Sequence, residues 1–147
     1  MTVTHEDERL NMIQVTEQTL DVAAHMAAVD DPRCGAVTTF VGQVRDHDPG
    51  VTGTVTSISY SAHPDAQSVL ERIVAEVSGG ADRLRIAVSH RVGDLVVGDL
   101  ALVVSVASAH RAQSYAASRE VVERIKVELP VWKKQHTADG AGHWSGI

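Results

Sequence analysis

The segment LALVVSVASA (100–109) is the longest apolar run in the chain, and it limits what the chain can fold into. Ten residues are too few to cross a bilayer as a helix, which needs about 20. A run this rich in valine is typical of a strand that is buried on both faces. We therefore predict a central strand at 99–108.

The composition suits one domain built around that strand. The chain has 147 residues, of which 44% are apolar and only 3% aromatic, so the core must be mainly aliphatic. Its net charge of −6 argues against non-specific nucleic-acid binding. The single cysteine, Cys34, excludes an internal disulfide, and the polar first residues lack the apolar stretch of a signal peptide. We expect a cytoplasmic protein with neither a nucleic-acid nor a membrane partner.

Hydrophobic periodicity predicts six strands and three helices. Strands are expected at 10–16, 35–45, 54–60, 84–93, 99–108 and 131–136. Helices are expected from an N-cap at Thr16 to about Val29, at 64–78 and at 110–128, the first burying Leu20, Ala23, Ala24 and Ala27. This order implies a single α+β domain, 1–147, with helices on one face of a mostly antiparallel sheet. Residues 1–9 and 137–147 are expected to be flexible.

All three lysines lie within nine residues of each other in IKVELPVWKKQ (125–135), whereas the other ten cations are arginines. Lysine differs from arginine because its amine can lose a proton when it is desolvated. Lys133 and Lys134 should point to opposite sides of an extended backbone, so only one of them can face Lys126. The cluster indicates a catalytic lysine, although a cation near a helix C-terminus is also stabilised by the helix dipole.

Three further cations are candidates for binding an anion. VRDH places Arg45 at a strand end, and SAHR places His110 and Arg111 at the start of the last helix, where free N–H groups favour anions. Each has a simpler structural interpretation, since Arg45 can pair with a neighbouring aspartate and the His–Arg pair can merely begin a helix. A helix of this length separates His110 from Lys126 by about 22–24 Å. The site is therefore elongated, or a second subunit completes it.

No metal site is expected, because the eight histidines include no HExxH or HxH pair and paired cysteines are absent. Cys34 is better explained as a small hydrophobic residue than as a nucleophile.

Four stretches together resemble successive motifs of the large, catalytic subunit of molybdopterin synthase. They are GAVTTFVGQVRDHDPG, HRVGDLVVGD, VVSVASAHRAQSYAASRE and IKVELPVWKKQ, and the similarity covers roughly residues 10–145. The resemblance implies an α+β fold of the α/β hammerhead type and a sulfurtransferase that converts cyclic pyranopterin monophosphate to molybdopterin. It implies that sulfur arrives as a thiocarboxylate on the C-terminal Gly-Gly tail of a small ubiquitin-like subunit. It also implies a central homodimer of large subunits within a heterotetramer, and no metal or organic cofactor.

The resemblance also implies roles for particular residues. The family's functional lysines correspond to Lys126 and Lys133, its substrate-binding residues to Arg45, His110 and Arg111, and an aromatic near its site to Phe40. We expect Lys126 to act mainly on the tail and its acyl carbon, Lys133 to act mainly on the substrate and in proton transfer, and Lys134 to take no part.

The chain departs from the family pattern at YSAH (60–63), where many members carry YEAY, so that Ser61 and His63 replace an acid and an aromatic. One alternative function is a non-catalytic docking module for the ubiquitin-like sulfur-carrier tail. A more distant one is an unrelated small-anion-binding enzyme such as a phosphate-ester lyase.

Overall fold

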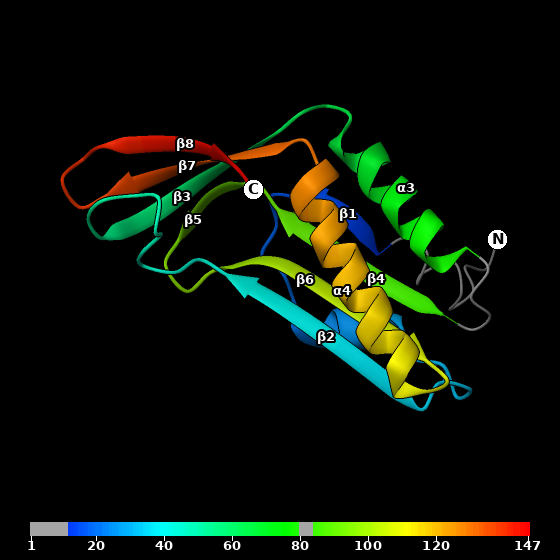
Figure 1. Ribbon diagram of the computed structural model, residues 1–147. Coiled ribbons are helices and arrows are strands. Elements are labelled where there is room, and N and C mark those ends of the chain that lie inside the picture. Colours follow the sequence, from blue (N-terminus) through cyan, green and yellow to red (C-terminus); the bar gives the residue numbers. More distant parts are fainter. Residues whose placement is uncertain (1–11, 80–83) are drawn as a thin grey trace.

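Two four-stranded sheets and three helices make up the computed structural model, which describes residues 12–79 and 84–147 (Figure 1). The strands are β1 (Ile13–Thr16), β2 (Ala36–Gln43), β3 (Val55–Ala62), β4 (Arg85–Arg91), β5 (Gly93–Val96), β6 (Leu100–Ser108), β7 (Val131–Thr137) and β8 (Gly142–Gly146). The helices are α2 (Val22–Ala28), α3 (Ala66–Ser78) and α4 (Arg111–Glu128). The α+β class predicted from the sequence is confirmed, but the strands divide between two sheets instead of forming one.

The first sheet has the strand order β1-β4-β6-β2 and carries most of the core. Strand β1 runs parallel to β4, and the other pairs are antiparallel. Strand β6 lies between β4 and β2, and all of it except Leu100 is buried. The apolar run LALVVSVASA therefore forms an interior strand, as predicted.

The second sheet has the order β5-β3-β7-β8 and is antiparallel throughout. Strands β5 and β8 were not predicted from the sequence: no strand was expected between 93 and 99, and 137–147 was expected to be flexible. Strand β8 is short and glycine-rich, so it has no apolar alternation of its own. It forms by pairing its backbone with β7, from Trp132↔Gly146 to His136↔Gly142. The expected flexible segment 1–9 lies outside the described residues.

Helices cover both faces of the first sheet, so the prediction that they cover one face was wrong. Consecutive strand residues point to opposite faces. Val88 and Val104 belong to the cluster under α3 and α4, whereas Ala87 and Ala107 pack with Val29 at the end of α2. The second face is lined by small residues, which leave only a weak apolar signal in the sequence.

Helix α2 is shorter than predicted and buries a different residue. Asp21 caps it instead of Thr16, because the Asp21 carboxylate accepts a hydrogen bond from the Ala24 N–H at 3.2 Å. The buried side chain is His25, whose Nε2 lies 2.7 Å from the Ser89 hydroxyl. Of the residues expected to be buried here, Leu20 is buried, Ala24 is half-buried, and Ala23 and Ala27 are exposed.

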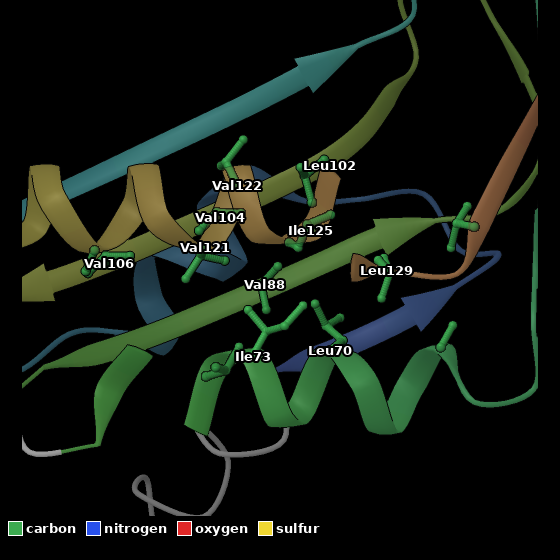
Figure 2. Packing of buried hydrophobic residues seen from close by; sticks show 14 of the residues in the cluster. Leu70, Ile73, Val88, Leu102, Val104, Val106, Val121, Val122, Ile125 and Leu129 are labelled. Carbon is green, nitrogen blue, oxygen red and sulfur yellow. The ribbon is translucent and has the colours of Figure 1, made fainter. Parts of the chain in front are cut away.

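The main core forms where α3 and α4 pack side by side on the first sheet (Figure 2). The predicted apolar stripes are confirmed: Ile73 and Val74 are buried on α3, and Val122, Ile125 and Leu129 on α4 and its C-cap. Within the described ranges no helix is both long and apolar enough to cross a membrane.

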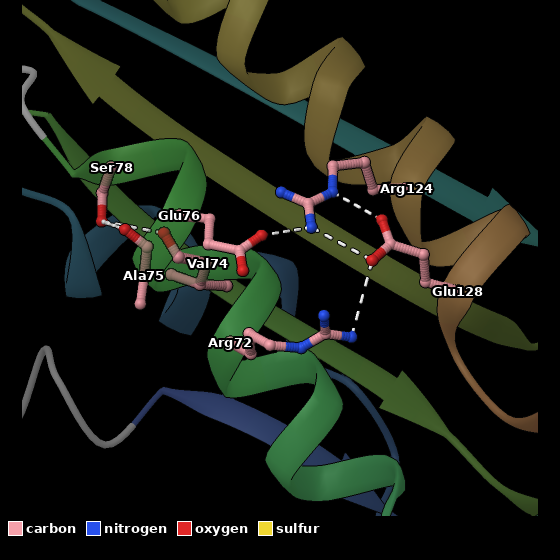
Figure 3. Close-up of polar contacts among 7 residues, drawn as sticks. All are labelled: Arg72, Val74, Ala75, Glu76, Ser78, Arg124 and Glu128. Atoms are coloured by element: carbon pink, nitrogen blue, oxygen red, sulfur yellow. Dashed lines mark hydrogen bonds and ion pairs between the residues drawn. The ribbon is translucent and has the colours of Figure 1, made fainter.

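A network of ion pairs links the solvent sides of α3 and α4 (Figure 3). Arg124 donates to Glu128 at 2.6 and 3.1 Å and to Glu76 at 2.5 Å, while Arg72 lies 3.5 Å from Glu128. Hydrogen bonds to Glu128 and Glu76 raise the pKa of the Arg124 guanidinium above its ordinary value. Water screens these pairs, so their main effect is to orient the last turns of α4.

An aromatic contact joins the two sheets. Tyr60 of β3 meets His90 of β4 edge to face, with ring centroids 5.3 Å apart and planes at 77°. The Nδ1–H of His90 donates to the Arg91 carbonyl at 2.8 Å. Burial lowers the pKa of His90 to about 4, and the nearby Lys126 ammonium lowers it too, against the effect of that hydrogen bond. The ring is therefore neutral at pH 7.

We predict that Ile125→Ala destabilises the protein by about 2–5 kcal/mol, because it removes a fully buried side chain from the α4 face. Val127→Ala is the matched control on the same helix, since Val127 is 84% exposed; we expect a change within about 0.5 kcal/mol. Urea unfolding measures both. Equal losses would contradict the packing described.

We also predict that the free energy of unfolding falls as the pH is lowered from about 6.5, the unfolded pKa of histidine, to about 4, its folded pKa at His90. Between these pH values histidine is protonated in the unfolded chain, whereas His90 stays neutral in the folded chain. The contribution of neutral His90 to the free energy of unfolding is therefore complete above the window and lost below it. The difference corresponds to about 3 kcal/mol. Urea unfolding at pH 7 and pH 4.5 measures it. A His90→Gln variant should lose most of this dependence; an unchanged slope would show that His90 is not its source.

Candidate active site

The joint between α4 and β7 places Lys126. The helix ends at Glu128, the Leu129 N–H closes its last turn by donating to the Ile125 carbonyl at 3.0 Å, and Pro130 cannot continue the helix. The chain then enters the second sheet at Val131. The buried side chains of Val121, Val122 and Ile125 hold the helix against the first sheet. Lys126 lies in the last turn of this helix, next to the joint.

Lys133 lies two residues into β7, in register with Tyr60 of β3 on one side and Ser145 of β8 on the other. Its amine lies 3.4 Å from a carboxylate oxygen of Asp48, which the turn after β2 brings to the sheet. Both side chains are about four-fifths buried, with 22% and 20% of their surfaces exposed. Lys133 is thus held in one place by a counter-ion.

Lys126 and Lys133 act on each other electrostatically. The pKa of Lys126 lies below its ordinary value, chiefly because surrounding atoms desolvate the amine and also because the Lys133 ammonium repels its charge; Glu123 opposes the shift. The Lys126 side chain as a whole is surface-exposed, so the desolvation is partial and concerns the amine's immediate surroundings. The same amine lowers the pKa of His90. These three residues therefore form one electrostatic cluster drawn from α4, β7 and β4.

Lys134 points to the opposite face of β7, as the alternation of a strand requires. Its amine lies 5.5 Å from the centre of the Trp144 ring on β8, a cation–π contact. Trp132 shares this outer face and is 45% exposed.

Arg45 stands exposed just beyond the end of β2. Both β2 and α4 run antiparallel to β6, so this strand end and the Lys126 end of α4 lie at the same end of the domain (Figure 1). The pairing of Arg45 with a neighbouring aspartate does not occur, since Asp46 contacts His47 and Asp48 contacts Lys133. Within the described residues Arg45 has no ion-pair partner, which leaves its guanidinium available to a ligand.

His110 and Arg111 lie at the other end of α4. His110 is the N-cap, and its backbone N–H donates to the Gln113 side chain at 3.3 Å. Lys126 lies sixteen positions further along the helix, about 24 Å along the axis. Phe40 lies between the two ends, opposite Val104 on the face of β2 that carries α4, and is 38% exposed. One protomer therefore brings together Lys126, Lys133 and the β2 end, but not His110 and Arg111.

Four residues around the lysines were not singled out from the sequence: Asp48, Tyr60, His90 and Gln135. Asp48, Tyr60 and His90 come from segments distant in sequence, with Asp48 85 positions from Lys133, whereas Gln135 lies on the same strand as Lys133. In the parts of the chain that the structure describes, no three His, Cys, Asp or Glu side chains are grouped closely enough to hold a metal ion.

Comparison of the sequence and the fold with those of known proteins identifies the family of the chain. Residues 15–128 match the family model described as MoaE protein. The molybdopterin synthase catalytic subunit 1 of Mycobacterium tuberculosis is 39% identical over 134 residues, covering 90% of this chain and 89% of that protein. A crystal structure of molybdopterin synthase from Staphylococcus aureus superposes with a TM-score of 0.82 at 29% identity, covering 92% of this chain and 97% of that one.

A more distant structural match shows that the fold is retained at low identity. It is a complex of subunits 1 and 2 of the molybdopterin-converting factor from Helicobacter pylori, with a TM-score of 0.73 at 17% identity over 90% of each chain. At that identity the likeness concerns the fold alone. The family match and the M. tuberculosis relative nevertheless span most of this sequence, and on that ground the chain belongs to the MoaE protein family.

Proposed function

We propose that this chain is the catalytic subunit of a molybdopterin synthase. It transfers sulfur from the thiocarboxylated C-terminus of a small ubiquitin-like subunit to cyclic pyranopterin monophosphate, forming the dithiolene of molybdopterin. The observation that carries the proposal is the pair of coupled amines, Lys126 and Lys133, at the joint of α4 and β7. The M. tuberculosis relative and the S. aureus structure, both named for molybdopterin synthase, support it.

The two amines suit the charges that develop in this reaction. Both the thiocarboxylate and the phosphate of the substrate are anions, which ammonium groups attract. The thiocarboxylate sulfur forms a bond to a substrate carbon as a carbon–oxygen bond at that carbon breaks, and the departing oxygen takes up a proton. Water then attacks the acyl carbon. The acyl–sulfur bond breaks, leaving sulfur on the substrate and a carboxylate on the tail. A nearby ammonium stabilises the tetrahedral oxyanion of the second step.

The structure favours a particular division of labour between the lysines. Lys133 has a salt-bridging counter-ion in Asp48, so it suits a fixed positive charge that holds an anion. Lys126 has a lowered pKa and, among the described residues, no carboxylate in salt-bridge contact. A lysine with a lowered pKa exchanges protons more readily near neutral pH. We therefore assign proton transfer to Lys126, which differs from the expectation drawn from the resemblance.

The remaining candidates suit substrate binding across two copies of the chain. Arg45 lies exposed at the Lys126 end of the domain and can hold a phosphate by charge-assisted hydrogen bonds. His110 and Arg111 lie about 24 Å along α4, beyond the reach of one small ligand in the same protomer. A homodimer in which the partner supplies these two residues, with Phe40 beside them, brings the set together. The small subunits complete a cytoplasmic heterotetramer.

We predict that Lys126→Ala and Lys133→Ala each lower turnover by about 10²-fold or more, because each removes a charge aimed at the reacting groups. Lys126→Arg should fail as well, since a guanidinium keeps the charge but does not exchange its proton. Product is measured with a thiocarboxylated small subunit and cyclic pyranopterin monophosphate.

Lys134→Ala is the matched control, because Lys134 lies on the opposite face of the same strand, over Trp144. We expect it to keep turnover within about two-fold of wild type, as surface substitutions usually do. Near-normal turnover by either alanine variant at 126 or 133 would remove that lysine from the mechanism. If wild type bound the small subunit but formed no product, the chain would be a docking module.

A further inference from the structure

The turn between β2 and β3 places a single carboxylate, that of Asp48, between two structural elements. Within the turn, the Asp48 carbonyl accepts from the Val51 N–H at 3.0 Å, and its Oδ1 accepts from the Gly50 N–H at 2.8 Å. Its Oδ2 is directed to the second sheet, where it accepts from the Lys133 amine at 3.4 Å and from the Gln135 side-chain amide at 3.2 Å. One oxygen therefore closes the turn, and the other reaches β7.

Both β7 partners are on the inner face of that strand. Lys133 and Gln135 are two residues apart and so share a face, opposite Tyr60 and Ile58 of β3. Gln135 is 4% exposed, so its amide needs an acceptor inside the protein, which Asp48 supplies. The hydrogen bond from Gly50, and those from Gln135 and Lys133, hold the pKa of the Asp48 carboxyl below its usual range, although its burial acts the other way. The carboxylate is ionised at neutral pH.

We propose that Asp48 is a positioning residue for sulfur transfer, aiming the Lys133 ammonium at the site and fixing its distance from the turn that follows Arg45. The inference rests on the proposed function and extends it. A lysine side chain rotates about four bonds, and fixing it in one rotamer costs up to about 2 kcal/mol of conformational entropy. Because the turn holds Asp48 in place, its contact fixes Lys133 before the substrate binds. This entropy is then not lost during substrate binding.

The contact leaves Lys133 able to bind an anion. An ammonium has three N–H donors, and Asp48 is the single hydrogen-bond acceptor that Lys133 has within the described residues. Lys126 and Arg45 lie at the same end of the domain, and Asp48 pairs with neither of them among the described residues. Asp48 thus orients one cation without cancelling the attraction for a phosphate or a thiocarboxylate.

The test is Asp48→Asn, assayed with the thiocarboxylated small subunit and cyclic pyranopterin monophosphate. The asparagine oxygen can still accept from Gly50, so the turn is kept while the charge that aims Lys133 is lost. We expect kcat to fall at least about ten-fold, with less than about a three-fold change in KM, because Lys133 is then no longer held where charge develops in the transition state. Asp46→Asn is the matched control in the same turn, since among the described residues the Asp46 side chain bonds only to the exposed His47; it should keep wild-type kcat.

A double variant separates aiming from mere structural support. In Asp48→Asn with Gln135→Glu, the carboxylate and the amide exchange places across the same 3.2 Å contact, and Lys133 regains a neighbouring negative charge. We expect the pair to recover most of the kcat lost in the single variant. A single variant with wild-type kcat, or a double variant no better than the single one, overturns the proposal. If wild type itself makes no product with its partner, it is the proposed function that fails.

Discussion

The packing of α4 against the first sheet is the interaction on which the arrangement of the two lysines depends. Val121 and Ile125 are fully buried there, so the helix cannot rotate or slide without exposing apolar surface. Because Pro130 stops the helix, the chain must leave the first layer at a fixed point and enter the second sheet. Lys126 belongs to one layer and Lys133 to the other, and this joint brings their amines near enough to interact electrostatically.

The joint gathers positive charge where the amine of Lys126 is partly desolvated and Lys133 is about four-fifths buried. The amines of Lys126 and Lys133 repel each other, and the buried ring beside them, His90, is kept neutral. Like charges that are partly desolvated cost stability, and such clusters are typical of sites that bind or transform anions. The Asp48 carboxylate compensates one of the two lysines and not the other. This asymmetry is the basis on which we propose different chemical tasks for two residues of the same type.

The sequence predicted the parts of the fold whose signal is local. The valine run of β6 and the apolar stripes of α3 and α4 are periodic within single elements, so their burial followed directly. Strands β5 and β8 were missed because each depends on backbone pairing with a distant strand. Helix α2 was misread because its alanines suggested an apolar face, whereas the buried side chain is His25, satisfied by Ser89.

The candidate site likewise contains residues that could be predicted from the sequence and residues that could not. The unusual use of lysine indicated Lys126 and Lys133, and strand alternation correctly turned Lys134 away from them. Asp48 and Gln135 could not be predicted, because their contact joins a turn to a strand more than 80 residues later. No local pattern distinguishes an aspartate that is hydrated in a turn from one that reaches across to another sheet.

The most direct test of the account is the pKa of the Lys126 amine, measured by NMR on protein with isotope-labelled lysine, of which the chain has only three. In wild type the pKa of Lys126 should lie below its ordinary value. In Lys133→Met it should rise part of the way back, because one source of repulsion is gone while the desolvation remains. An ordinary pKa in wild type, unchanged in the variant, would show that the two amines do not share a site.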